Sequence, residues 1–154
     1  MATVYTAQTI NSYNPIVVPS QVGVPCVTKG RYTVSAAFVI NDIVKLNILP
    51  AGCVPLDFLL GCTDLDGATT MTVSVGLWDG TTGLTASTNF ITESTVAQAG
   101  GIARAAALDF LTTIQKATTD RYIALKVIAA PTGTAVTSGY IWGILTYEYA
   151  QYGF

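Results

Sequence analysis

The sequence contains no histidine, and charged residues make up only 10% of its 154 residues. Histidine titrates near neutral pH and is the commonest metal ligand, so its absence argues against acid–base and metal-dependent catalysis. Ordinary soluble domains carry about 25% charged residues. With 51% apolar residues, this chain has too little charge to cover the surface of a free domain. We therefore expect a non-enzymatic building block that buries surface against neighbouring subunits.

Long apolar runs and clusters of positive charge are also missing. A membrane-spanning helix needs about 20 consecutive apolar residues, and the nearest stretch, Tyr122–Ala130, is shorter and is interrupted by Lys126. The first residues lack the basic and apolar segments of a signal peptide. The net charge is −2 and the seven basic residues are scattered, which argues against a phosphate-binding surface. We expect a protein that binds neither membranes nor nucleic acids and is not exported.

The three cysteines, Cys26, Cys53 and Cys62, include no Cys-x-x-Cys pair. An odd number cannot form a complete set of disulfides, and without histidine a zinc site would lack a fourth ligand. A catalytic cysteine would also need a base beside it. We therefore expect free thiols that pack as small hydrophobic side chains, and no cofactor, metal ion or catalytic residue.

The first thirty residues differ in composition from the remainder. Residues 5–28 carry no charge, and prolines are spaced through them at Pro15, Pro19 and Pro25. Proline lacks a backbone donor and favours extended geometry in the residue before it. We expect residues 1–30 to form an extended N-terminal arm, with at most one edge strand, lying along its own domain or a neighbour. Residues 31–154 would form the folded domain.

From Arg31 onward, strand-like segments alternate with turn signals. The clearest strand is Thr70–Trp78, where apolar and polar residues alternate with the period of two that half-buried antiparallel strands show. Glu93–Ala107 is the one helix-like stretch, but Gly100 and Gly101 limit it to one or two turns. The other predicted strands are Tyr32–Ile40, Ile43–Leu49, Cys53–Cys62, Thr85–Ile91, Leu108–Ile114, Arg121–Ala129 and Ser138–Tyr149.

These short strands predict an all-β, jelly-roll-like antiparallel sandwich of about eight strands. In Ile43–Leu49 we expect Val44, Leu46 and Ile48 on one face and Lys45 and Asn47 on the other. The last strand, Ser138–Tyr149, is apolar on both faces. Such a strand should be covered on both sides, so we expect the arm or another subunit to cover its outer face.

Several segments resemble the small jelly-roll structural proteins of tailed bacteriophages, particularly capsid decoration or cement proteins. The segments are Asp42–Gly52, Val54–Asp57, Asp64–Asp66, Val73–Gly80 and Ser138–Tyr149. The resemblance implies a homo-oligomer, a dimer or trimer, that binds the major capsid protein on the outer surface of the virion. It also implies synthesis in the host cytoplasm, a role in stabilising the head against internal DNA pressure, and no catalytic residue.

We expect the contacts of such a protein in its most apolar uncharged segments, the arm and the C-terminal aromatics. The predicted contact residues are Ile16, Val17, Val18, Val22, Val24, Tyr147, Tyr149, Tyr152 and Phe154. A second hypothesis is a carbohydrate-binding fibre or tail protein that recognises the host surface, because aromatic rings also stack on sugars. Its candidate residues are Trp78, Tyr140 and Trp142 together with the same terminal aromatics.

Acidic residues offer two weaker candidate sites. Asp57, Asp64 and Asp66 would supply carboxylates for a calcium ion, although Asp-x-Asp-Gly is also ordinary turn chemistry. Glycosidases act through two carboxylates, for which the candidate pairs are Asp109 with Glu93 and Asp79 with Asp57. We expect most of these side chains to be exposed or to cap turns.

Overall fold

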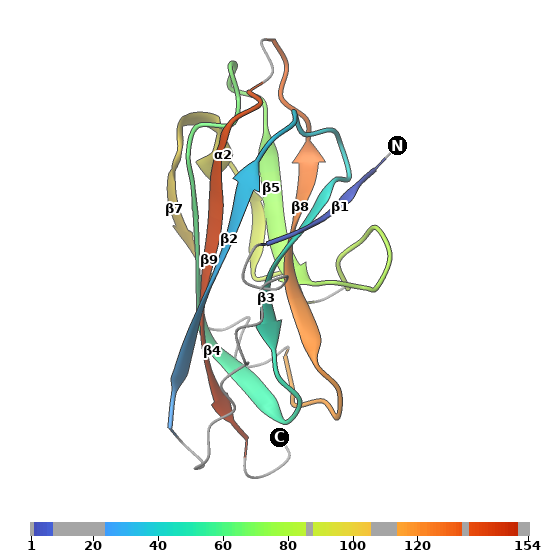
Figure 1. The fold of residues 1–154 in the computed structure, drawn as a ribbon, viewed down its shortest axis with the longest axis vertical. Coiled ribbons are helices and arrows are strands. Elements are labelled where there is room, and N and C mark those ends of the chain that lie inside the picture. The colour runs from blue at the N-terminus through green and yellow to red at the C-terminus, as the bar shows by residue number, and fades with distance from the viewer. Residues whose placement is uncertain (1, 8–23, 86–87, 106–113, 134–135, 151–154) are drawn as a thin grey trace.

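The computed structural model describes residues 2–7, 24–85, 88–105, 114–133 and 136–150. These residues form two β-sheets packed face to face (Figure 1). Sheet A has the strand order β1-β3-β8-β5-β6, and sheet B has the order β2-β9-β4-β7. The strands are β1 Val4–Thr6, β2 Cys26–Val34, β3 Ile43–Leu49, β4 Cys53–Cys62, β5 Thr72–Leu77, β6 Ile91–Ser94, β7 Gly101–Arg104, β8 Arg121–Ala129 and β9 Gly139–Tyr149.

The strand order confirms the predicted jelly-roll sandwich. Strands β2 to β9 contribute four strands to each sheet, and every pairing among them is antiparallel. Such an arrangement of two four-stranded sheets is typical of jelly rolls. β1 is added at the edge of sheet A, parallel to β3.

The core lies between the two sheets, and β5 supplies its most regular part. Met71, Val73 and Val75 are completely buried, as the alternation of Thr70–Trp78 predicts, but Ser74, which the same alternation places outside, is buried as well, and its Oγ accepts the Glu93 N–H at 2.9 Å. Phe58 of β4 meets Phe90 from the opposite side of the sandwich at 5.4 Å between ring centroids. Large apolar side chains from both sheets therefore interlock, as a two-layer fold requires.

The simple alternation predicted for β3 is wrong at its centre. The register with β8 shifts between Lys45 and Asn47, so Leu46 is an extra residue in the strand. A bulge exchanges the faces of the residues that follow it. Asn47 consequently points inward and is buried, whereas Ile48 is partly exposed. The Asn47 amide donates hydrogen bonds to the carbonyl and hydroxyl oxygens of Thr28, both at 3.3 Å.

β2 lies earlier in the sequence than the predicted Tyr32–Ile40 strand. It runs from Cys26 to Val34, and its inward position Gly30 lies against the backbone of β3. A Cβ atom on Gly30 would overlap the Leu46 carbonyl oxygen. Only glycine fits there. Because this inward position has no apolar side chain, the alternation of the strand is not visible in the sequence.

The N-terminal residues are held on their own domain. The backbone N–H of Thr3 donates to the Asp42 carboxylate at 2.7 Å, and the Tyr5 ring packs on Tyr32 at 5.3 Å. Val4–Thr6 supplies one edge strand, and β2 begins within the segment predicted as the arm. Residues 8–23, which include most of that segment, lie outside the described structure.

The segment between β5 and β8 departs furthest from the sequence prediction. The strand predicted at Thr85–Ile91 instead lies at Ile91–Ser94. The helix-like stretch contains one helical turn, α2 Val96–Ala99, and then becomes β7 after Gly100, which has a φ of 74°. The predicted strand Leu108–Ile114 falls almost wholly outside the described residues. No helix in the described ranges is long and apolar enough to cross a membrane.

Candidate functional site

The thiols are the first candidate reactive groups, and all three are free. Cys53 and Cys62 are buried, and Cys26 is half-buried. Burial raises the pKa of Cys62 to about 12, and its Sγ donates to the Val96 carbonyl at 3.3 Å. Burial also raises the pKa of Cys53. Since the thiolate is the nucleophilic form, the raised pKa values disfavour reaction of these two cysteines at neutral pH, and the prediction of free packing thiols is confirmed for Cys53 and Cys62.

Asp66 organises a turn rather than a metal site. Its buried carboxylate accepts backbone N–H groups from Ala68 at 3.0 Å, Thr70 at 2.7 Å and Met71 at 2.6 Å. Burial by itself would raise the pKa of Asp66, but these hydrogen bonds to the ionised form outweigh it and lower that pKa below its usual value. The carboxylate therefore stays ionised and closes the loop that leads into β5.

The other described acidic candidates take part in an ion pair and in turns. Asp57 makes a two-pronged ion pair with Arg104 at 2.7 and 3.0 Å. Asp64 accepts from the backbone of Asp66, and Asp79 accepts from Thr81 and Gly83 within its own loop. Among the described residues no cluster of three metal-ligating side chains occurs. Asp109, one half of the other proposed pair, lies outside the described residues.

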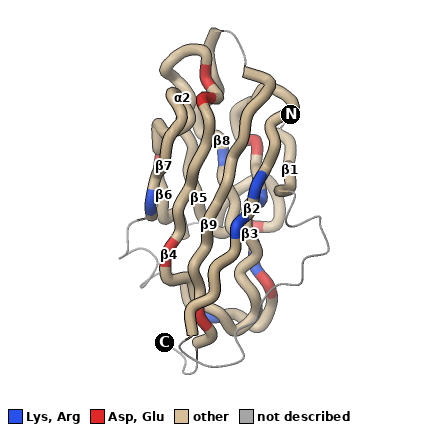
Figure 2. The backbone as a smooth tube through the Cα atoms, turned by 60° about the vertical axis from the view of Figure 1, so that its left-hand side comes forward, with Lys and Arg blue, Asp and Glu red and all other residues tan. Residues whose placement is uncertain are grey.

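The outer face of sheet B has mostly uncharged residues on its central strands β9 and β4, where Asp57 is ion-paired with Arg104, between positively charged margins. Following the strand register, Lys29, Ile144, Leu59 and Arg104 form one row across the four strands. Arg31, Trp142 and Ile102 form the next, where the Trp142 indole covers Gly61. Figure 2 shows positive charge on β2 and at the opposite margin, with mostly uncharged strands between them. The last strand was predicted to be apolar on both faces. Its outward residues Trp142 and Ile144 lie on this surface, and both are partly exposed.

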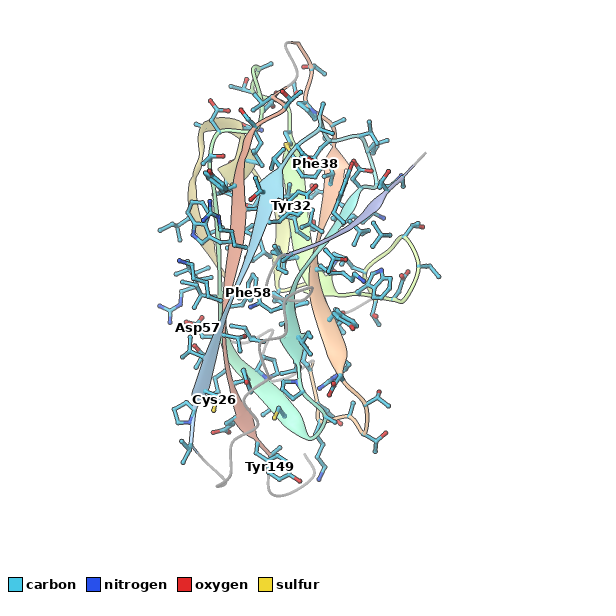
Figure 3. All side chains as sticks on the ribbon, viewed as in Figure 1. Cys26, Tyr32, Phe38, Asp57, Phe58 and Tyr149 are labelled. Carbon is cyan, nitrogen blue, oxygen red and sulfur yellow. The ribbon has the colours of Figure 1, made fainter. Side chains whose placement is uncertain are left out.

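We call one end of the sandwich the lower end. Its residues include Val24, Cys26, Cys53, Arg121 and Tyr149. Figure 3 shows Cys26 and Tyr149 together at this end. Val24 is 45% exposed and Tyr149 is 40% exposed. These are two of the nine predicted contact residues, and both remain at the surface.

A third predicted contact residue, Tyr147, is instead completely buried. It belongs to the core, where burial raises its pKa to about 12. Its prediction as a contact residue is wrong because the odd positions of β9, from Ile141 to Tyr147, face inward. The six other residues lie outside the described structure; they are Ile16, Val17, Val18, Val22, Tyr152 and Phe154.

Arg121 is a feature of the lower end that sequence reasoning did not identify. Its side chain is half-buried, and Nη2 donates to the Cys53 carbonyl at 3.1 Å. Its Nε is buried without a hydrogen-bond partner, and its guanidinium forms no ion pair with the described residues. A buried charge without a counter-charge is unfavourable. The sequence gives no signal of this, because an arginine at the start of a strand is usually solvated.

The opposite, upper end contains a recess of about 420 Å³. Its lining includes Thr33, Thr63, Asp64, Ser138, Gly139 and Tyr140, from the ends of β2 and β4 and the start of β9. Gly139 has a φ of 152°, and a Cβ there would overlap the Thr63 hydroxyl. This close approach lets the Tyr140 N–H donate to Thr63 Oγ1, and the Thr63 N–H donate to the Tyr140 carbonyl, both at 3.0 Å.

Three solved phage capsids contain chains similar to this one. A chain of the capsid of Ralstonia phage GP4 is 31% identical, with a match that covers 97% of this chain and 99% of that chain at a TM-score of 0.80. A match of this identity over nearly the full length of both chains decides the family. This chain belongs to that phage capsid family.

A chain of the cyanophage Pam1 capsid asymmetric unit also matches this capsid protein, at 25% identity over 90% of this chain and 95% of that chain, with a TM-score of 0.67. A chain of the acidic stable capsid of Helicobacter pylori bacteriophage KHP30 shares the fold, at 16% identity over 84% and 92% and a TM-score of 0.51. No protein-family model and no curated protein matches the sequence. The capsid protein is thus a structural component of a virion, as the resemblance in its sequence implied.

Proposed function

We propose that this capsid protein is a decoration protein, which binds the lattice of the major capsid protein on the outer surface of the head. The observation that carries the proposal is the near full-length match to a chain of the Ralstonia phage GP4 capsid. The sandwich supports a mechanical role, because the carboxylates of Asp57 and Asp66 serve an ion pair and a turn, and its buried thiols serve packing. A protein that holds adjacent capsomers together needs non-covalent binding surfaces and no catalytic residues.

The lower end is the part of the described surface best suited to this adhesion. Tyr149 and Val24 expose apolar area, and tyrosine and arginine are enriched where protein interfaces concentrate their binding energy. Burying about 200 Å² of apolar surface contributes about 5 kcal/mol before ordering costs. Repetition over a lattice strengthens the attachment through avidity.

Arg121 indicates the chemistry of the partner surface. Its guanidinium lacks a carboxylate among the described residues, and its Nε is buried without a partner. A carboxylate offered by the capsid lattice would form a charge-assisted hydrogen bond with the part of the half-buried guanidinium that stays exposed. The proposal therefore includes an acidic side chain of the major capsid protein that reaches Arg121.

Self-association is a second part of the proposal. Only 10% of the residues are charged, and the outer face of sheet B exposes Val27 by 63% and Ile102 by 67%. Exposed apolar surface of this kind favours assembly. We propose a dimer or trimer, with the arm and the C-terminal aromatics contributing contacts to the lattice or to neighbouring copies.

Binding to empty capsids that lack this protein tests the proposal. We expect the full chain to co-sediment with such capsids, and Val24→Asp at the lower end to weaken binding by about tenfold or more. Ile40→Asp is the matched control, because Ile40 is 56% exposed at the upper end. Thermal melting of both variants checks the fold. Absence of co-sedimentation by the full chain, or equal binding by the two folded variants, would contradict the proposal.

A further inference from the structure

We propose that the recess at the upper end binds a neutral saccharide. The recess measures about 420 Å³, which is within the size range of small-ligand sites, about 300–1,000 Å³. It is open to solvent and brings hydroxyl, carboxylate and aromatic side chains together from three strands that are separate in the sequence. These are the groups that hydrogen-bond sugar hydroxyls and pack against the apolar faces of sugar rings.

The hydrogen-bonding groups of the recess are already oriented. Thr63 Oγ1 accepts the Tyr140 N–H at 3.0 Å, so its own hydroxyl proton is free to be donated to a ligand. Asp64 is exposed, and its Oδ1 accepts the Asp66 N–H at 3.0 Å, which fixes the direction of the carboxylate. Thr33 and Ser138 add two exposed hydroxyls that both donate and accept.

The aromatic component is Tyr140, which is 40% exposed. The Arg31 guanidinium stacks on its ring at 3.9 Å from the centroid, and such a contact restricts the orientation of the ring. Preorganisation of this kind lowers the entropy lost on binding. Tyr140 therefore offers a fixed aromatic surface at the mouth of a polar recess.

The charge of the recess favours a neutral ligand over an anionic one. Asp64 is the charged side chain of the lining and would repel phosphate or carboxylate groups. Arg31 is stacked on the Tyr140 ring and is not part of the lining. Nucleotides and phosphorylated ligands therefore fit poorly, whereas uncharged polyols fit the donors and acceptors present.

The position of the recess keeps it accessible if the proposed lower-end docking is correct. β9 has 11 residues; Tyr140, the second, lies at the recess, and Tyr149, the last, lies at the other end of the strand. The nine residue steps between them span roughly 30 Å. On a decorated head the recess would then face away from the lattice. This accessibility rests on the proposed function, whereas the binding chemistry of the recess does not.

The test is a titration of the full chain with a panel of neutral mono- and disaccharides, followed by ¹H–¹⁵N NMR. We expect saturable shifts at Thr63, Asp64 and Tyr140 for at least one sugar, and a loss of affinity of about tenfold or more in Tyr140→Ala and Asp64→Ala. Ile102→Ala is the matched control, because Ile102 is 67% exposed on the same sheet, outside the recess lining. Melting temperatures verify that each variant is folded.

No saturable shift with any sugar up to about 10 mM, or an equal loss in Ile102→Ala, would overturn the inference. Capsid binding separates it from the proposed function, because Tyr140→Ala should co-sediment with capsids as the unsubstituted chain does. Sugar binding by the free chain but not by decorated capsids would overturn the lower-end docking and support the saccharide site.

Discussion

At the scale of single residues, the acidic side chains show what sequence patterns can and cannot reveal. Asp-x-Asp-Gly at residues 64–67 predicts turn chemistry, and Asp66 forms such a turn. The ion pair of Asp57 with Arg104 could not be predicted, because it joins residues 47 positions apart. Arg121 was not identified and Tyr147 was misjudged, since the surroundings of both side chains are set by how the strands pair and pack.

The Asp66 carboxylate should make stability dependent on acid pH. Its folded pKa is lowered, so its contribution is complete above the unfolded value of about 3.9 and is lost as the pH falls through the folded pKa. We expect Asp66→Asn to lower the free energy of unfolding by about 2–4 kcal/mol at pH 7. The difference from the unsubstituted chain should shrink below about pH 4 in urea titrations.

Asp120→Asn is the matched control for this experiment, because Asp120 is exposed and accepts one backbone N–H, from Ala51 at 2.8 Å. Its loss should change the free energy of unfolding by less than about 1 kcal/mol. A difference between Asp66→Asn and the unsubstituted chain that stays constant from pH 7 to about pH 3 would contradict the role given to the Asp66 carboxylate.

The cysteines give a second prediction at this scale. Burial raises the pKa of Cys62 to about 12 and also raises that of Cys53, which disfavours the thiolate of both at neutral pH. Cys26 is half-buried and should react first with a thiol-specific reagent such as dithionitrobenzoate. We expect one fast thiol per chain in the native state and three after denaturation. Fast reaction of the native Cys26→Ser variant would show that the buried thiols are accessible.

At the scale of elements, the sequence predicts the positions of strands well where an apolar segment lies between clear turn signals. β8 has the predicted bounds, β5 lies within its predicted range, and β9 begins one residue after its predicted start. The errors occur where a second chain segment sets the conformation. β2 was misplaced because Gly30 accommodates the backbone of β3, and the face of Asn47 was misjudged because the bulge at Leu46 depends on pairing with β8.

The contact between β2 and β3 is therefore a sensitive point of the fold. A Cβ on Gly30 would overlap the Leu46 carbonyl, which is backbone and cannot move without displacing the bulge. We expect Gly30→Ala to lower the free energy of unfolding by about 2–3 kcal/mol or more, or to prevent folding. Lys29→Ala, the exposed neighbouring position, should change it by less than about 0.5 kcal/mol. Similar denaturation midpoints for the two variants would contradict the close packing at Gly30.

At the scale of the whole molecule, composition was the most informative property of the sequence. The absence of histidine and the low charge predicted assembly rather than catalysis, and the match to a phage capsid chain agrees with that inference. The proposed lattice-binding end could not be predicted, because it depends on strand pairing and contacts that bring Arg121 and Tyr149 together beside Cys53.

The same argument predicts self-association. If the scarcity of charge reflects surface buried in assembly, the purified chain should have a mass in solution of two or three chains, as measured by light scattering at micromolar concentration. Arg31→Glu reverses one charge at the margin of sheet B, and we expect it to weaken self-association through that face. Arg31 is suitable because it is exposed beside the apolar rows of the face. A monomer that remains soluble at high concentration would contradict the proposed oligomer.

The most direct test of the decoration role is an electron cryo-microscopy reconstruction of empty capsids incubated with the purified chain. The account predicts added density on the outer surface, with the end carrying Tyr149 and Arg121 against the lattice and the recess near Tyr140 facing solvent. Capsids that acquire no added density, or density in which the chain forms the shell itself, would contradict it.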